Sequence, residues 1–417
     1  MEQEGTVEPD SCWKGTSQRK LEQAEKEMIE LSGLGEEEIR VYKVQVECDQ
    51  SFREENKGNG MHNQLEEDSE MGMVNPMIIN KNIDPYTGKK IKPRKKRHRK
   101  TCCCLPCCCS TRVVPITKEY IMTYEFGNKS KPEIVLIHGF GGSALIFFKL
   151  FKRLSENYHV YAIDLLGMGR SSRPKFLART KTEAEDYYIC SIEMWRESLG
   201  LDNMNIVAHS FGAYITSRYA LKYPDKVKKI VFWSPHGCEP KPEDYEQKLK
   251  ERLRGGCCRK CMLKTMLFIF KHEIKPSRII FCCGRCIGSC WIKNYVKRRF
   301  VNMTDTEKEV AGRYLYQLLM REQSGEKAIF KLMKMPILAY TPIYDELDKL
   351  NSHKIEISFV YGDRDWIDTQ MGGTNVSQLL KRRGEKVSII HDSDHHLYLD
   401  NPEDLLDSLD EEMQKQS

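Results

Sequence analysis

The chain has 417 residues, a net charge of +6 and a hydrophobic content of 40%, which predicts one large domain with polar appendages. It begins without a basic and apolar leader and has no window of 18 consecutive apolar residues, so we expect neither a secretory signal nor a membrane-spanning helix. The sequence therefore predicts a cytoplasmic protein whose seventeen cysteines do not form a disulfide framework.

Residues 1–88 form an acidic segment rich in Glu, Gln, Asp and Ser and poor in aromatic residues. Such a composition cannot bury enough apolar surface to offset the entropy of ordering. We predict that this segment is a disordered tail and that regular structure begins only after Pro115.

Residues 89–112 combine a polybasic run, KKIKPRKKRHRK, with the cysteine cluster TCCCLPCCCS. The basic run alone is compatible with a nuclear-localisation patch, a solvated linker or attachment to anionic lipid. Neighbouring cysteines favour a two-signal membrane anchor in which S-acyl chains supply apolar burial. The candidates for S-acylation are Cys102, Cys103, Cys104, Cys107, Cys108 and Cys109. A zinc site is the alternative, but adjacent cysteines suit tetrahedral ligation poorly.

Strand and helix patterns alternate through residues 113–235, which form the first part of a predicted core. Apolar strands are expected at 133–140, 159–166, 205–210 and 227–234, and helices at 144–155, 183–200 and 211–223. This alternation predicts a mostly parallel sheet covered by helices on both faces. The pattern resumes in residues 351–417, with strands at 354–362 and 386–392, a helix near 375–382 and a last helix from Glu403.

Residues 236–350 interrupt the pattern with a basic, aromatic and cysteine-rich stretch, which we interpret as a helical lid. The run MLKTMLFIF with basic flanks suits a lid that lies on a lipid surface. Ordinary packing with buried free cysteines is the alternative. Paired cysteines at 258/261 and 283/286 approach the spacing of a zinc ribbon, which is a third interpretation.

A candidate nucleophile lies where a predicted strand meets a helix, in the run Ala208-His209-Ser210-Phe211-Gly212. Small residues two positions before and after Ser210 allow the sharp turn of a nucleophile elbow. The usual motif is G-x-S-x-G, and here Ala208 replaces the first glycine.

A glycine-rich turn, His138-Gly139-Phe140-Gly141-Gly142, ends an earlier strand. It predicts an oxyanion hole formed by the backbone N–H groups of Phe140 and Phe211. The turn from Asp164 to Ser171, which ends the next strand, is interpreted as structural.

An acid and a base follow the nucleophile in the chain order of the α/β-hydrolase fold. Asp365 lies directly after a strand and is the favoured acid, with Asp368 one helical turn later as the alternative. His391, His395 and His396 are the candidate bases, and the family resemblance given below favours His395 because of its position relative to Asp400-Asn401-Pro402. The three groups predict a serine hydrolase that works through an acyl-enzyme.

The runs LIHGFGGS, AIDLLGMGRSSRP, SIEMWRESLGLDNMNIVAHSFGAY, LKYPDKVKKIVFWSPHG, SGEKAIFKL, YGDRDWID and HHLYLDNP resemble the α/β-hydrolase-domain proteins 4 and 5. The resemblance covers roughly residues 117–409 and is weakest in the cysteine-rich insertion. It implies the α/β-hydrolase fold and acyl lipids as substrates. One member, a lipase co-activator, has asparagine at the nucleophile position, so Ser210 here favours the hydrolases of the branch.

The same branch carries an H-x-x-x-x-D motif implicated in acyl transfer to lysophosphatidic acid, matched here by His395 and Asp400. Asp400-Asn401-Pro402 also has the composition of a helix start. Acyl transfer is therefore the second hypothesis, and a non-catalytic lipid-binding regulator of a lipase is the third.

These patterns predict a hydrolase that cleaves an acyl group from a phospholipid, lysophospholipid or N-acyl phospholipid. It is expected to need no cofactor or metal and to bind no nucleic acid. Its expected location is the cytoplasmic face of an anionic membrane or a lipid droplet.

Overall fold

The computed structural model describes residues 16–47, 118–241, 285–334, 338–368 and 374–414, together with a few residues between 245 and 274. The polybasic and cysteine-rich segment 89–112 lies outside these residues, as do most cysteines of the insertion. The predictions made for them stay predictions.

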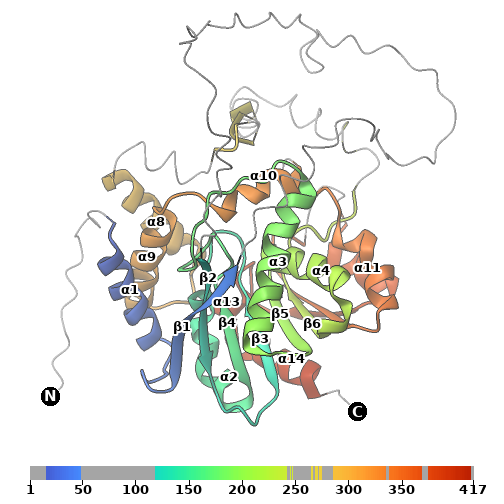
Figure 1. The fold of residues 1–417 in the computed structure, drawn as a ribbon, viewed down its shortest axis with the longest axis horizontal. Helices are drawn as coiled ribbons and strands as arrows, with labels where there is room; N and C mark the ends of the chain where they lie inside the picture. The colour runs from blue at the N-terminus through green and yellow to red at the C-terminus, as the bar shows by residue number, and fades with distance from the viewer. Residues whose placement is uncertain are drawn as a thin grey trace, which may run out of the picture. The chain divides into compact units, whose positions relative to one another are not determined.

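Eight strands form one sheet in the order β1-β2-β4-β3-β5-β6-β9-β10 (Figure 1). They are β1 (Ile39–Glu47), β2 (Lys118–Phe126), β3 (Glu133–Ile137), β4 (His159–Ile163), β5 (Met204–His209), β6 (Val227–Trp233), β9 (Glu356–Gly362) and β10 (Lys386–Ile390). Only β2 runs antiparallel to its two neighbours, and the other pairs of this sheet are parallel. The prediction of a mostly parallel α/β-hydrolase sheet is confirmed.

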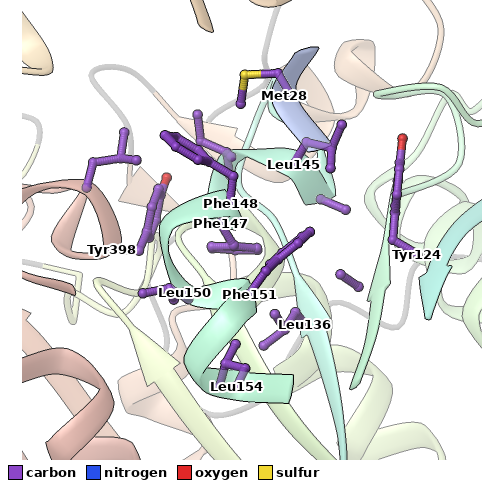
Figure 2. Packing of buried hydrophobic residues seen from close by; sticks show 14 of the residues in the cluster. Met28, Tyr124, Leu136, Leu145, Phe147, Phe148, Leu150, Phe151, Leu154 and Tyr398 are labelled. Carbon is purple, nitrogen blue, oxygen red and sulfur yellow. The ribbon is translucent and has the colours of Figure 1, made fainter. Parts of the chain in front are cut away.

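Helices cover both faces of this sheet, as its apolar strands require. In β3, Ile134 and Leu136 join one hydrophobic core, while Val135 and Ile137 join the other, because successive side chains of a strand point to opposite faces. The helices of the fold are η3 (Ala144–Leu150), α2 (Phe151–Asn157), α3 (Lys181–Leu199), α4 (Phe211–Lys222), η4 (Pro224–Lys226), α11 (Ile343–Ser352), α12 (Val376–Arg383), α13 (Leu397–Asp400) and α14 (Pro402–Gln414). Figure 2 shows the first of the two cores, where aromatic side chains of η3 and α2 pack together.

The prediction of a disordered tail over residues 1–88 is wrong for two segments within it. Residues 18–30 form helix α1 (Gln18–Glu30), and residues 39–47 form β1, which pairs with the whole of β2. Leu21, Ala24 and Met28 share one face of α1 and are buried in the first core (Figure 2). The composition argument averaged over 88 residues and so missed this short amphipathic spacing.

Hydrogen bonds and ion pairs join α1 to the sheet, to a turn of the core and to the insertion. The Tyr124 hydroxyl of β2 donates to Glu25 at 2.6 Å, and Arg170 forms an ion pair with the same carboxylate. Arg313 of the insertion contacts Glu27 at 2.6 Å. The N-terminal helix is therefore held by both the core and the insertion.

The insertion leaves the sheet after β6 and returns to it before β9. Its described elements are α8 (Arg285–Arg299), α9 (Asp305–Leu319), η5 (Gly325–Ala328), α10 (Ile329–Leu332) and the short strands β7 (Met333–Lys334) and β8 (Leu338–Ala339). α9 packs against α8 and α1, whereas α11 packs against α4 of the core. The core thus resumes near Ile343, earlier than the predicted boundary at 351. In the described part of the chain, no helix is long and apolar enough to cross a bilayer.

Candidate active site

Ser210 occupies a strained turn between β5 and α4. Its φ of 53° and ψ of −119° are unusual for a residue with a side chain. The Ser210 N–H donates to the Trp233 carbonyl at 3.0 Å, which anchors the turn to β6. An added Cβ at Gly212 would lie 2.5 Å from the His138 carbonyl oxygen, so glycine is required there, whereas the Ala208 methyl is accommodated in the core.

The side chains of Ser210, His395 and Asp365 lie in one chain of contacts. His395 Nε2 is 3.0 Å from Ser210 Oγ, and His395 Nδ1 is 3.3 Å from Asp365 Oδ1. All three residues are buried. Burial alone would raise the pKa of the Asp365 carboxyl, but the adjacent His395 imidazole, together with hydrogen bonds from Ser234 and the Ile367 N–H, outweighs burial and lowers this pKa. The geometry is that of a serine nucleophile, a base and a carboxylate that orients the base.

Asp368, the alternative acid, is engaged elsewhere. Its carboxylate accepts the Ser377 N–H at 2.6 Å, the Ser377 hydroxyl at 2.7 Å and the Asn375 side-chain amide at 3.0 Å. These contacts hold the first turn of α12. Among the other two histidines considered, His391 is exposed, and His396 is half-buried and lines the same cavity without contacting the Ser210 hydroxyl.

The glycine turn after β3 lies directly against the elbow. An added Cβ at Gly139 would lie 3.0 Å from Ser210 Cβ, and the Phe140 and Phe211 rings meet edge to face at 6.1 Å. Phe211 is the first residue of α4, where N–H groups lack an intrahelical acceptor. Neither its N–H nor that of Phe140 donates to an acceptor among the described residues. Both amides are thus available for the oxyanion of a tetrahedral intermediate.

His138 joins this turn to the next one. Its Nδ1 donates to the Gly139 carbonyl at 2.7 Å, while its Nε2 accepts the Leu165 N–H at 3.0 Å. These partners fix the neutral tautomer, and burial lowers the pKa of the imidazole to about 4. Apart from the position of His138 before the glycines, nothing in the sequence indicates this role.

The turn after β4 is organised by Asp164, in line with its predicted structural role. Its two carboxylate oxygens accept the N–H groups of Ala144 and Arg170, each at 2.6 Å. Burial raises the pKa of this carboxyl to about 7. An added Cβ at Gly169 would lie 2.3 Å from the Asp164 carboxyl, which explains the glycine.

The loop that carries His395 is held from the elbow and from the insertion. His209 Nε2 donates to the His395 carbonyl at 2.9 Å. Asp394 accepts the His395 N–H at 2.8 Å and forms a 2.8 Å ion pair with Arg299 at the end of α8. Sequence reasoning assigned His209 only to the elbow and did not identify Arg299, since its partner lies 95 residues away.

Asp400, the acidic residue of the predicted acyltransfer motif, lies behind this loop. Its Oδ2 accepts the Asp394 N–H at 2.9 Å, and its carbonyl accepts the Asn302 side-chain amide at 2.8 Å. Burial raises the pKa of the Asp400 carboxyl. The residue is absent from the lining of the cavity that contains Ser210.

That cavity has a volume of about 990 Å³ and combines core and insertion residues. Apolar side chains from both parts form much of its wall: Ile146, Phe270, Ile292, Phe300, Leu315, Leu319 and Ile329. Cavities of this size hold ligands with a long apolar part. Within the described segments, no group of three His, Cys, Asp or Glu side chains is placed to hold a metal ion.

Comparisons with known proteins agree with this geometry. Residues 132–253 match the family described as alpha/beta hydrolase fold. The chain is 33% identical over 278 residues to the 1-acylglycerol-3-phosphate O-acyltransferase ABHD5 of Sus scrofa, covering 66% of this chain and 75% of that protein. It is 29% identical over 294 residues to a (lyso)-N-acylphosphatidylethanolamine lipase of Bos taurus, covering 68% and 81%.

Among solved structures, a bromoperoxidase from Bacillus anthracis is similar with a TM-score of 0.51 and 18% identity, over 72% of this chain and 96% of that one. At such identity the similarity concerns the fold alone. The relatives similar in sequence match about two thirds of this chain. The chain therefore belongs to the α/β-hydrolase-domain 4 and 5 branch of the α/β-hydrolase fold proteins.

Proposed function

We propose that this protein is a serine hydrolase that cleaves an acyl group from a phospholipid, a lysophospholipid or an N-acyl phospholipid. The observation that carries the proposal is the contact chain from Ser210 through His395 to Asp365. Ser210 and His395 line a cavity with apolar walls. The combination suits a substrate with a carbonyl next to a long hydrocarbon chain.

In the proposed mechanism, Ser210 Oγ attacks the substrate carbonyl while His395 Nε2 takes the hydroxyl proton. The Asp365 carboxylate keeps the proton on Nδ1 and stabilises the imidazolium that forms. The Phe140 and Phe211 N–H groups bind the oxyanion, each typically contributing about 3 kcal/mol to lowering the barrier. His395 then protonates the leaving group, and a water molecule releases the acyl group from Ser210.

Phospholipids are the proposed substrate class because relatives of the chain carry names that refer to acylglycerol phosphates and N-acylphosphatidylethanolamine. Acyl transfer is the second candidate activity, since the acyl-enzyme is common to both reactions and only the acceptor differs. A lipid hydroxyl would then replace water as the acceptor. The third candidate, a non-catalytic lipid-binding regulator, predicts no covalent chemistry at Ser210.

An active-site fluorophosphonate probe tests the proposal directly. We expect it to label the full-length wild type and to leave Ser210→Ala unlabelled, while both proteins show the same thermal midpoint. Lipid profiling of turnover by the two proteins then identifies the substrate and separates hydrolysis from acyl transfer. A folded wild type that resists the probe would leave the regulator as the remaining hypothesis.

We also propose that segment 89–112 attaches the protein to the cytoplasmic face of an anionic membrane or to a lipid droplet. The support is the sequence alone, in which nine basic residues precede six clustered cysteines. Replacing Cys102, Cys103, Cys104, Cys107, Cys108 and Cys109 by serine is expected to shift the protein from the membrane fraction to the supernatant. Unchanged fractionation would exclude this anchor.

A further inference from the structure

Helix α8 presents two different faces. Ile292 and Val296 of α8 and Phe300 directly after it follow a spacing of four residues, are buried and join the first core, and Ile292 and Phe300 also reach the cavity. Trp291, Asn294, Tyr295 and Arg298 follow the spacing i, i+3, i+4, i+7, which places them together on another face. All four of these residues line the cavity that contains Ser210. The polar and aromatic face of α8 is therefore part of the cavity wall.

The formal charges in this wall are all positive. Lys297, Arg298 and Arg299 line the cavity, and no Asp or Glu does so among the described residues. Arg299 is neutralised by Asp394 at 2.8 Å. Lys297 and Arg298 are exposed and form no ion pair with any residue that the structure describes. The end of α8 thus contributes two uncompensated positive charges to a cavity whose other walls are largely apolar.

The groups around these charges suit a phosphate. The Arg298 guanidinium can donate two parallel hydrogen bonds to phosphate oxygens, and the Lys297 ammonium adds a point charge. The Asn294 amide is a further donor on the same face of the helix. Trp291 is 62% exposed, and an amphipathic indole is typical of residues at the boundary between apolar and polar parts of a lipid.

We propose that the last two turns of α8 form a headgroup subsite that selects lipids with a negatively charged phosphate over zwitterionic ones. Lys297 and Arg298 bind the phosphate, and the apolar walls hold the acyl chain beside Ser210. A choline headgroup binds less well because its cation meets these two charges. The inference rests on the proposed function for the position of the acyl group, and it names the class of headgroup.

Binding to the Ser210→Ala full-length protein tests the subsite without turnover. The ligands are lysophosphatidic acid and lysophosphatidylcholine with the same acyl chain, both below their critical micelle concentrations. We expect the first to bind at least about tenfold more tightly, because its phosphomonoester can accept one more charge-assisted hydrogen bond than the phosphodiester of lysophosphatidylcholine, and one such bond accounts for roughly this factor. Adding Lys297→Gln and Arg298→Gln is expected to abolish the preference. Both side chains are exposed, so the variant should fold.

Lys293→Gln is the matched control. Lys293 lies one turn earlier on α8, pairs with Glu309 at 3.8 Å and does not line the cavity. We expect this variant to keep the preference for lysophosphatidic acid. An equal loss in the control and in the double variant would show a general effect of surface charge and overturn the subsite.

Competition separates a lipid headgroup from free phosphate. Glycerol 3-phosphate should displace lysophosphatidic acid, whereas inorganic phosphate at the same concentration should do so much less. Equal competition by the two anions would overturn the assignment to a lipid headgroup. Because these measurements use Ser210→Ala, failure of the proposed hydrolysis appears separately, as absent fluorophosphonate labelling of the wild type.

Discussion

Asp400 gives the sharpest test of how acyl transfer and hydrolysis are related in this protein. The motif interpretation makes Asp400 a participant in acyl transfer, whereas the structure places it behind the His395 loop as an acceptor for the Asp394 N–H at 2.9 Å. In that position it acts through His395, which every reaction of Ser210 requires. The structure therefore predicts that removing the Asp400 carboxylate lowers hydrolysis and acyl transfer by the same factor.

The size of the effect follows from the hydrogen bond that is lost. Asp400→Ala leaves the part-buried Asp394 N–H without this acceptor, which costs about 1–3 kcal/mol. If the loop leaves its position to satisfy that N–H with water, kcat/KM falls by roughly 5- to 150-fold. Asp400→Asn keeps an oxygen that can accept the same hydrogen bond, so its activity should stay within about threefold of wild type.

The assay measures both products in one reaction that contains the acyl donor and lysophosphatidic acid. Mass spectrometry quantifies the released fatty acid and the newly acylated lipid for wild type, Asp400→Ala and Asp400→Asn. The rate of fluorophosphonate labelling reports independently on His395, and the thermal midpoint reports on folding. Selective loss of acyl transfer in Asp400→Asn, with hydrolysis intact, would refute the positioning role.

Three further predictions follow from buried groups. Met28→Ala should lower the free energy of unfolding by about 2–4 kcal/mol in urea denaturation, because Met28 is only 1% exposed; an unchanged midpoint would show that α1 does not belong to the fold. Asp365→Asn should reduce kcat by about 10⁴-fold, whereas Asp368→Asn should mainly lower the thermal midpoint, and the opposite result would reassign the acid. The pKa of His138 is about 4 in the folded state, below the ordinary 6.5 of the unfolded chain. The unfolded state therefore takes up the proton first, so stability is intact above pH 6.5 and falls by up to about 3 kcal/mol as the pH drops towards 4. Between pH 7 and 4.5, urea midpoints should fall less for His138→Gln than for wild type, and parallel declines would contradict the argument.

The core and the elbow were predictable because their signals are local. Strands buried on both faces appear as continuous apolar runs, as in β3. The elbow needs small residues at fixed positions beside Ser210, since a Cβ at Gly212 would collide with backbone. The order of nucleophile, acid and base along the chain then indicated Asp365 and His395. Local sequence left Asp365 and Asp368 as alternatives, and the contact of Asp365 with His395 together with those of Asp368 with α12 distinguishes them.

The elements that sequence reasoning missed depend on partners far along the chain. β1 pairs with β2 from Ile39 opposite Phe126 to Glu47 opposite Lys118. A long polar segment separates the two strands in the sequence, and it dominates the average composition of residues 1–88. Its side chains Val44 and Val46 are buried only because the rest of the sheet is already present. The run VYKVQVE does alternate apolar and polar residues as a half-buried strand does, and the average over residues 1–88 concealed it.

The topology explains why the insertion contacts the loop that carries His395. β6 and β9 are adjacent parallel strands, and the insertion connects the carboxyl end of β6 to the start of β9. The elbow and the His395 loop follow β5 and β10 at that same carboxyl edge, where ligands of open α/β sheets bind. A chain that leaves the sheet there must pass over the site before it returns. Arg299 pairs with Asp394 at the end of α8, directly after the two cations that face the cavity. The helix that closes the cavity thus also holds the backbone of the loop that positions the base.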